Sequence, residues 1–361
     1  MSVDISIPVG NTTLPLSAFG DELIQTLSPA EQHAVRFCLD WRNGKDIFEI
    51  KTSGSTGQPK VIGLRREQMI ASAQMTAKAL RLQKGMTALA CLDTNLVGGL
   101  MMLVRSMELG MNLVITEPLA NPFVNVPSGV RIDFVALVPY QLKTILSSPQ
   151  ANRFNTIQQV IIGGGDVDAN LEKSLQAYTA DFYATYGMTE TISHVALRRL
   201  NGGQRQATFH ALDGVHLYTD ERGCLVIRAG YLGTDPIITN DVVDLTSPTE
   251  FRWLGRADFV INSGGVKVNP EKVEAAIAAL MPQVRYFVHG FPHHKLGEQV
   301  CLVVEGNRWS NERIALLLEA MKSELSKFEV PKQVLFVERF VLAGNEKINR
   351  KETGRLAALA G

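Results

Sequence analysis

Residues 52–60 read Thr52-Ser53-Gly54-Ser55-Thr56-Gly57-Gln58-Pro59-Lys60, directly after Asp46 to Thr52, a stretch that predicts a strand. The nine residues supply four hydroxyls, two glycines and one lysine. Glycine N–H groups, hydroxyls and a cation together suit phosphate oxygens, so this is a candidate phosphate loop. The spacing differs from the GxxxxGKS/T pattern of P-loop NTPases, which disfavours that class. From these residues alone, a flexible surface turn explains the loop equally well.

Strand-like and helix-like segments alternate after this loop. Apolar residues at helical spacing, among them Met69, Ala73 and Leu80, predict a helix over 65–83, and a second helix is expected over 96–109. Strands that interleave with helices form parallel βαβ units with helices on both faces of the sheet. We therefore expect an α/β fold, with a large N-terminal domain of mostly parallel sheets flanked by helices. Short apolar runs predict its strands at 87–92, 112–116, 132–138 and 159–162.

The pattern changes twice further along the chain. From Gly202 to Trp253 short strands and turns predominate. After Gly255, Asn269-Pro270-Glu271 predicts a helix to about Leu280, with Asn269 as its N-cap. The rest predicts a small α+β domain, so we place a boundary near 255–258 and expect domains at 1–255 and 256–361. Its other elements are strands at 285–290, 299–305 and 333–337 and a helix at 311–325.

Composition limits the class of protein. The chain has 361 residues, 36 Lys+Arg and 36 Asp+Glu, so its formal net charge is zero, which argues against a strongly basic nucleic-acid binder. No apolar run approaches the roughly 20 residues of a membrane span, and the N-terminus lacks the pattern of a signal peptide. The four scattered cysteines predict buried or semi-buried free thiols in a reducing compartment. We expect a cytoplasmic protein; a homodimer is compatible with the sequence, which does not specify the oligomeric state.

Further segments carry residues with chemical potential. Taken singly, each has a plain explanation: the glycine triplet as a tight turn, Thr189 as a helix cap, and the basic cluster from Lys347 to Arg355 as a solvated tail. The segments are Gly163-Gly164-Gly165, Tyr183 to Thr191 (YATYGMTET), Thr239-Asn240-Asp241, Gly255-Arg256-Ala257-Asp258, Gly264 to Glu271 (GGVKVNPE) and Glu346-Lys347-Ile348-Asn349-Arg350.

Together with TSGSTGQPK, and in this order, these segments resemble the motifs of the acyl-adenylate-forming enzymes, the AMP-dependent synthetases and ligases. The resemblance extends from about residue 47 to residue 361. It implies that ATP, Mg²⁺ and coenzyme A are bound, that Tyr186 stacks on adenine, that Thr189 contacts phosphate and that Glu190 helps to hold the metal. The carboxylate of Asp241 would bind the ribose, with Asp244 as a nearby competitor. The implied ATP or AMP contacts are Thr52, Ser53, Gly54, Ser55, Thr56, Gly57, Lys60, Gly164, Gly165, Tyr186, Gly187, Asp241 and Arg256.

The same resemblance implies two half-reactions. Lys347 would bridge the acid and the α-phosphate while the carboxylate attacks ATP, with Thr189 and Glu190 assisting. The small domain would then rotate about Asp258, and the 264–271 loop, with Gly264, Gly265 and Lys267, would serve the step in which coenzyme A takes the acyl group. Three residues depart from the usual pattern: Asn240 and Glu346 replace glycines, and Asn262 replaces a lysine. Only 51 residues precede Thr52, so we expect the N-terminal region to be shortened.

The acid is indicated by a narrower resemblance. Leu137 to Leu142, Tyr186 to His194 and Gly98 to Arg105 are most similar to the o-succinylbenzoate–CoA ligases of menaquinone synthesis. A dicarboxylic acid needs a cation for its second carboxylate, and Arg105 is our candidate; a position on the helix surface is an equal alternative for this arginine. His194 is expected to line the pocket, and a structural hydrogen bond is at least as good an explanation for it. Other aryl or short-chain acids, a carrier protein as acceptor, and a non-catalytic nucleotide binder remain alternatives. The expected acid pocket comprises Asn95, Arg105, Tyr140, Ser193 and His194.

Overall fold

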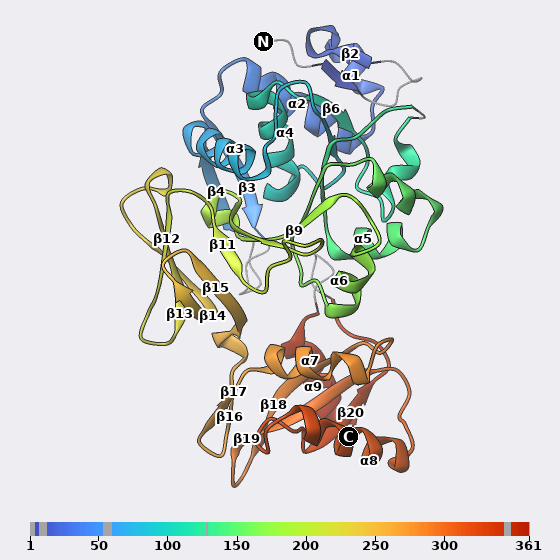
Figure 1. The fold of residues 1–361 in the computed structure, drawn as a ribbon, viewed down its shortest axis with the longest axis vertical. Helices are drawn as coiled ribbons and strands as arrows, with labels where there is room; N and C mark the ends of the chain where they lie inside the picture. The colour runs from blue at the N-terminus through green and yellow to red at the C-terminus, as the bar shows by residue number, and fades with distance from the viewer. Residues whose placement is uncertain (1–3, 7–12, 53–59, 128, 343–347, 361) are drawn as a thin grey trace.

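The computed structural model describes residues 4–6, 13–52, 60–127, 129–342 and 348–360. In this part of the chain, thirteen strands form one large sheet and five form a second sheet (Figure 1). A separate antiparallel hairpin consists of β3 (Ile47–Thr52) and β4 (Lys60–Arg65). Thr52 pairs with Lys60 at the end of this hairpin, so the predicted phosphate loop joins its two strands. Residues 53–59 and Lys347 lie outside the described residues.

One half of the large sheet is parallel, as the alternation of strands and helices predicted. Successive residues of its strands point to opposite faces, and two buried clusters result. One cluster packs under α3 (Arg66–Leu80) and α4 (Val97–Leu109), the other under α5 (Pro139–Leu146) and α6 (Ala169–Leu175). In spatial order the parallel strands are β1 (Asp4–Ser6), β6 (Asn112–Ile115), β5 (Thr87–Ala90), β7 (Phe134–Leu137), β8 (Gln159–Ile162) and β9 (Asp181–Gly187), with β2 (Thr13–Pro15) antiparallel at the edge.

The other half of the large sheet is antiparallel. It begins where β10 pairs antiparallel with β9, and it covers the region in which the sequence showed short strands and turns. The predicted α/β class is thus confirmed, with a mixed sheet in which the antiparallel half continues the parallel one. Beyond β9 the order is β10 (His194–Arg199), β11 (Phe209–Ala211), β15 (Glu250–Arg256), β14 (Ile237–Ser247), β13 (Cys224–Ala229) and β12 (Val215–Thr219).

The N-terminal region contributes two helices that we did not predict, α1 (Asp21–Gln25) and α2 (Pro29–Arg42). The start of α2 carries a sequence signal that could have revealed it, because Ser28 and Glu31 form a capping box around Pro29. Trp41 secures the end of α2: its indole donates to Glu108 of α4 at 2.7 Å and stacks under the Arg66 guanidinium at 4.1 Å. The N-terminal helices are therefore packed onto the wall formed by α3 and α4.

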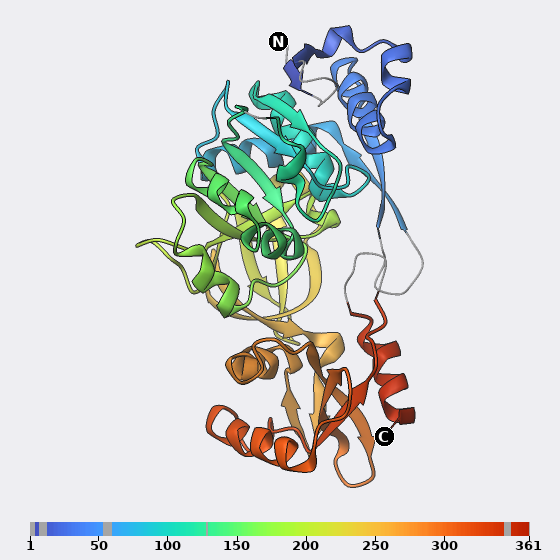
Figure 2. The ribbon, with the colours of Figure 1, turned by 90° about the vertical axis from the view of Figure 1, so that its right-hand side faces the viewer.

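The second sheet follows β15 and lies at the opposite end of the molecule from the N-terminus (Figure 2). One face is covered by α7 (Pro270–Ile277) and α8 (Asn311–Glu324), the other by α9 (Arg350–Ala360). The predicted helix at Asn269-Pro270 is present, but the Asn269 side chain makes no capping hydrogen bond. The strands are β16 (Ile261–Ser263), β17 (Val266–Val268), β18 (Tyr286–His293), β19 (Gly297–Glu305) and β20 (Gln333–Val337).

Two general expectations can be compared with the structure. All four cysteines are buried free thiols, as predicted. Among the described residues, no helix has both the length and the apolar character that crossing a membrane requires.

Candidate active site

Asp241 is the centre of a hydrogen-bonded cluster at the junction of β9, β14 and β15. Its carboxylate accepts a hydrogen bond from the Tyr186 hydroxyl at 2.7 Å and one from the Trp253 indole at 3.3 Å. The Arg256 guanidinium lies 3.5 Å from the same carboxylate and contacts Asp258 at 2.6 Å. Asp241 is only 7% exposed, so its charge is held by fixed donors. The structure thus brings together three residues of the predicted nucleotide site.

Two features of this cluster bear on the predicted roles. Burial, and then the neighbouring Asp241 carboxylate, raise the pKa of Tyr186, so the hydroxyl remains the donor. The Tyr186 ring also packs edge-on against Phe251, with centroids 5.0 Å apart. Asp244, the competing carboxylate, is exposed and lies opposite Arg252 on β15. Its exposure makes it the weaker candidate for a fixed ribose contact.

The segment that links β9 to β10 carries Thr189 and Glu190 in a single turn of 3₁₀ helix, Thr189–Thr191. Glu190 is exposed and Thr189 is half-buried. The side chain that closes the turn is Thr191, whose hydroxyl bonds Met188 and the Ser193 carbonyl at 2.9 and 2.6 Å. The alternative in which Thr189 caps a helix is therefore wrong, and Thr189 and Glu190 remain available to a ligand.

The glycine at 187 has a steric explanation. A Cβ at this position would lie 2.3 Å from the Ser193 carbonyl oxygen and 2.4 Å from the Cα of His194. The strand after the turn passes so close to Gly187 that no side chain fits. In the other glycine turn, Gly164 has a φ of +79°, and a Cβ at Gly163 would lie 2.6 Å from the Thr185 hydroxyl. Both turns thus require glycine for backbone reasons.

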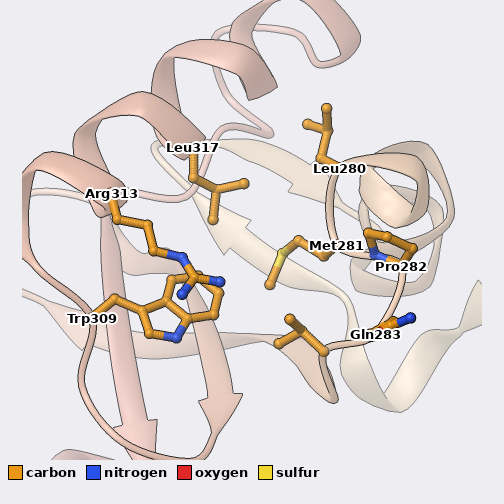
Figure 3. Close-up of a pocket in the computed structure, with 8 residues that line it drawn as sticks. Leu280, Met281, Pro282, Gln283, Trp309, Arg313 and Leu317 are labelled. Atoms are coloured by element: carbon orange, nitrogen blue, oxygen red, sulfur yellow. The ribbon is translucent and has the colours of Figure 1, made fainter.

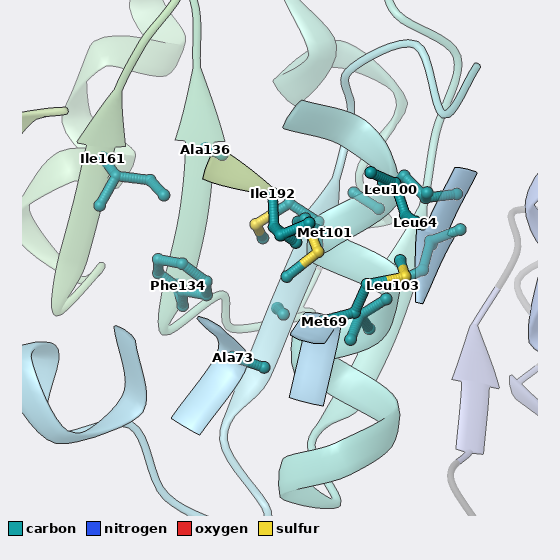
Figure 4. Close-up of a cluster of buried hydrophobic side chains, with 14 of the residues drawn as sticks. Leu64, Met69, Ala73, Leu100, Met101, Leu103, Phe134, Ala136, Ile161 and Ile192 are labelled. Atoms are coloured by element: carbon teal, nitrogen blue, oxygen red, sulfur yellow. The ribbon is translucent and has the colours of Figure 1, made fainter. Parts of the chain in front are cut away.

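Ile192 is a site feature that sequence reasoning missed. It adopts a φ of +68°, which is unfavourable for a β-branched residue, yet its side chain is 4% exposed. The side chain points into the core beside Met101 of α4 (Figure 4). Burial of this side chain offsets the backbone strain and fixes the direction in which Ser193 leaves the turn. No pattern in the sequence marks such a conformation.

Arg105 is buried in the interior between α4 and this turn. Arg105 is only 1% exposed, so the alternative interpretation as a surface arginine is wrong. One guanidinium nitrogen donates to the Ser193 hydroxyl at 2.7 Å, while Nε has no partner among the described residues. Burial lowers the pKa of Arg105 to about 9. No nearby carboxylate in the described chain contributes to that shift.

His194 completes the buried group. Its Nε2 lies 3.1 Å from the Thr76 hydroxyl of α3, which itself donates to the Ser72 carbonyl at 3.0 Å, so the imidazole nitrogen must donate. Burial, and then the charge of Arg105, lower the pKa of His194, which keeps the ring neutral. The hydrogen bond gives His194 the structural role that was one of its two interpretations.

Two other predicted pocket residues, Asn95 and Tyr140, are exposed, whereas Arg105 is buried. Asn95 is exposed, bonds Asp93, and lines a cavity of about 340 Å³ between α2, β3 and the start of α4. Tyr140 is 55% exposed at the start of α5. A further cavity of about 390 Å³ is lined by Met281, Trp309 and Arg313, and by no residue of the Asp241 cluster (Figure 3).

The residues predicted for the coenzyme A step belong to the hairpin of β16 and β17 in the second sheet. Gly264 and Gly265 form the turn between β16 and β17, with φ values of +60° and +83°, and Lys267 is exposed. In Figure 1 this hairpin lies away from β9, so the structure does not bring these residues to the Asp241 cluster. Closer to the cluster, Glu271 of α7 approaches Gly255 of β15, where a Cβ would lie 2.6 Å from Oε2.

The described residues include no group of three or more His, Cys, Asp or Glu side chains that could hold a metal ion. Mg²⁺ is usually bound through one or two carboxylates together with substrate phosphates. Glu190, next to Thr189, is exposed, and its one carboxylate fits that mode of binding.

Comparison with known proteins assigns the class. Residues 44–216 match the family of AMP-binding enzymes. A solved structure of an acyl-CoA synthetase (AMP-forming)/AMP-acid ligase II-like protein from Dyadobacter fermentans is 38% identical; the match covers 94% of this chain and 99% of that one, with a TM-score of 0.61. The chain belongs to the family of AMP-binding enzymes and is an AMP-forming CoA ligase.

Particular relatives are more distant. The 2-succinylbenzoate–CoA ligase of a Bacillus cereus strain is 25% identical over 336 residues, which cover 85% of this chain and 69% of the relative. The o-succinylbenzoate coenzyme A synthetase of Bacillus subtilis, solved with ATP and magnesium ion, is 19% identical over 85% of this chain and 69% of that one, with a TM-score of 0.72. The Bacillus subtilis enzyme shares the fold.

Proposed function

We propose that this chain activates o-succinylbenzoate with ATP and transfers the acyl group to coenzyme A, a step of menaquinone biosynthesis. The observation that carries the choice of acid is Arg105, a fully buried cation with no carboxylate partner among the described residues. The names of the relatives at 25% identity support the same acid.

The nucleotide would occupy the Asp241 cluster. Tyr186 offers an aromatic surface to adenine, Asp241 accepts from the ribose hydroxyls, and Arg256 lies beside both. Thr189 and the phosphate loop would hold the phosphates, and Glu190 would hold Mg²⁺, which neutralises phosphate charge. Because a carboxylate attacking a phosphate brings two anions together, neutralisation is the main requirement, and Lys347 would contribute to it.

The acid would extend from this cluster toward Arg105. Withdrawing a guanidinium from water costs several kcal/mol, whereas one hydrogen bond to an uncharged hydroxyl such as that of Ser193 returns only about 1.5–3 kcal/mol. A carboxylate is the partner that restores the balance, and a guanidinium can bind it through two parallel hydrogen bonds. A substrate with a second carboxylate, placed at Arg105 and Ser193, satisfies this site.

The thioester step would use a different arrangement of the two domains, 1–255 and 256–361. Asp258 lies between β15 and β16, where rotation would present Gly264, Gly265 and Lys267 to the acyl-adenylate. The thiol of coenzyme A then attacks the acyl carbon and AMP leaves. The chemistry needs no nucleophile from the protein, which agrees with the burial of all four cysteines.

Acid-dependent ATP–pyrophosphate exchange tests the proposal, followed by thioester formation with coenzyme A. We expect exchange with o-succinylbenzoate, and much weaker exchange with analogues that lack either of its carboxyl groups. Equal exchange with the analogues would indicate another aryl or short-chain acid. Adenylation without transfer to coenzyme A would indicate a carrier protein as acceptor, and no exchange with any acid would indicate a nucleotide-binding relative.

A further inference from the structure

Arg222 connects the turn between β12 and β13 to the residues just before Asp241. One guanidinium nitrogen donates to the Asn240 side-chain oxygen at 2.9 Å, and the other donates to the Thr239 carbonyl at 3.2 Å. Its Nε donates to Asp220 at 2.9 Å. A single side chain thus bonds both residues that precede the candidate ribose carboxylate.

The arginine is itself held in place. Asp220 accepts hydrogen bonds from the backbone N–H groups of Arg222 and Cys224 at 2.9 and 3.0 Å, which closes the turn. Gly223 completes it with a φ of +75°. Although the Arg222 side chain is 52% exposed, its direction is set by the Asp220 carboxylate and by the closed turn. An exposed arginine that is fixed in this way can hold the groups it bonds in a defined position, in addition to supplying a positive charge.

Asn240 is the acceptor that makes this connection specific. Thr239 and Asp241 are buried on one side of β14, so the intervening Asn240 points to the other side, toward Arg222. Where the related motifs usually have glycine, the Arg222 guanidinium would find no side-chain acceptor. Asparagine at position 240 therefore makes no demand on the Asp241 carboxylate and adds a hydrogen bond to Arg222 on the opposite side of the strand.

We propose that Arg222 is a positioning residue for the nucleotide, which acts through Asn240 and Thr239 to hold Asp241 in the geometry that binds ribose. The inference rests on the proposed nucleotide role of Asp241. Arg222 touches neither the acid side of the site nor Ser193 and Arg105. Its loss should weaken nucleotide binding while leaving the interaction with the acid unchanged.

Calorimetric titration of AMP into the purified chain tests this directly and needs no knowledge of the acid. We expect Arg222→Ala and Asn240→Ala each to weaken AMP binding about five-fold, the effect of losing roughly one net hydrogen bond. The double variant should be no weaker than Arg222→Ala alone, because that change already removes the hydrogen bond to Asn240. Asn240→Asp keeps an acceptor and should bind AMP as the wild type does. Arg228→Ala, at an exposed arginine on β13, is the matched control.

The exchange assay adds a second readout. For Arg222→Ala the KM for ATP should rise about five-fold with the KM for the acid unchanged; a merely structural role would raise both. Wild-type AMP affinity in both Arg222→Ala and Asn240→Ala would overturn the inference alone, as would additive losses in the double variant. Absence of AMP binding by the wild-type chain would overturn the proposed nucleotide site together with the inference.

Discussion

On the proposed nucleotide side of the site, Asp241 accepts hydrogen bonds from Tyr186 and Trp253 and lies beside Arg256; on the proposed acid side, Arg105 donates a hydrogen bond to the uncharged hydroxyl of Ser193. In the first region, the Asp241 carboxylate already has hydrogen-bonding partners from the protein before a ligand binds. The second holds a buried cation without a carboxylate partner in the described chain. Substitutions should therefore weaken nucleotide binding in small steps, because neighbours compensate, but should remove recognition of the acid almost completely.

The largest effect is expected for Lys347→Ala, at the residue that would serve both sides at once. Losing one donor that stabilises charge in the transition state typically costs about 10²–10³-fold in rate. We expect acyl-adenylate formation to fall about 10³-fold, while thioester formation from supplied acyl-adenylate is spared. Lys351→Ala, an exposed lysine of the same basic cluster, is the control. Equal loss of both steps, measured by pyrophosphate release and by thioester yield, would contradict the assignment.

Arg105→Met should affect the acid side alone. We expect kcat/KM for the dicarboxylic acid to fall about 10²-fold, since the second carboxylate would lose its partner, with little change for a monocarboxylic analogue. Arg105→Lys should lose an intermediate amount, because an ammonium cannot make two parallel bonds. A methionine in place of a buried unpaired cation should not lower thermal stability. A uniform loss with both acids would assign Arg105 a structural role.

Asp241→Asn tests the nucleotide side. The amide keeps the shape but loses the charge next to Arg256 and one acceptor position, so we expect the KM for ATP to rise about ten-fold with the KM for the acid unchanged. Asp244→Asn is the matched control, because that exposed carboxylate is three residues along the same strand. A larger effect at Asp244 than at Asp241 would reassign the ribose contact.

The two sides also differ in how far the sequence could predict them. The apolar segments predicted α3, α4, β8 and β20 closely, because each of these elements buries apolar side chains in a core cluster. The motifs assigned Tyr186, Asp241 and Arg256 to one site, and the structure places these three side chains next to one another. The strand at 46–52 was predicted, but its partner β4, with which it forms a separate hairpin, was not. Strand partners depend on tertiary contacts that local composition does not encode.

The acid side was harder to predict because it depends on burial and on backbone strain. An arginine in an apolar helix is compatible with either an exposed or a buried position until its neighbours are known. Ile192 has a left-handed backbone conformation, which sets the direction of Ser193. Because β-branched residues rarely adopt this conformation, the sequence does not indicate it. Gly187 was predicted as a ligand contact, and its close approach to Ser193 became apparent only in three dimensions.

Tyr186→Phe should give the smallest effect and is the finest test of the contrast between the two sides. The ring and its packing against Phe251 remain, so only the hydroxyl donor to Asp241 is lost. We expect AMP affinity to fall about three-fold, because Trp253 and Arg256 still hold the carboxylate. Combined with Asp241→Asn the losses should be less than additive, since both changes act on one interaction; Tyr183→Phe on the same strand is the control. If Tyr186→Phe lowered AMP affinity about 10²-fold, as Arg105→Met is expected to lower kcat/KM for the acid, the contrast between the two sides would be wrong. The Asp241 carboxylate would then depend on the single donor Tyr186, and its other hydrogen bonds would not compensate.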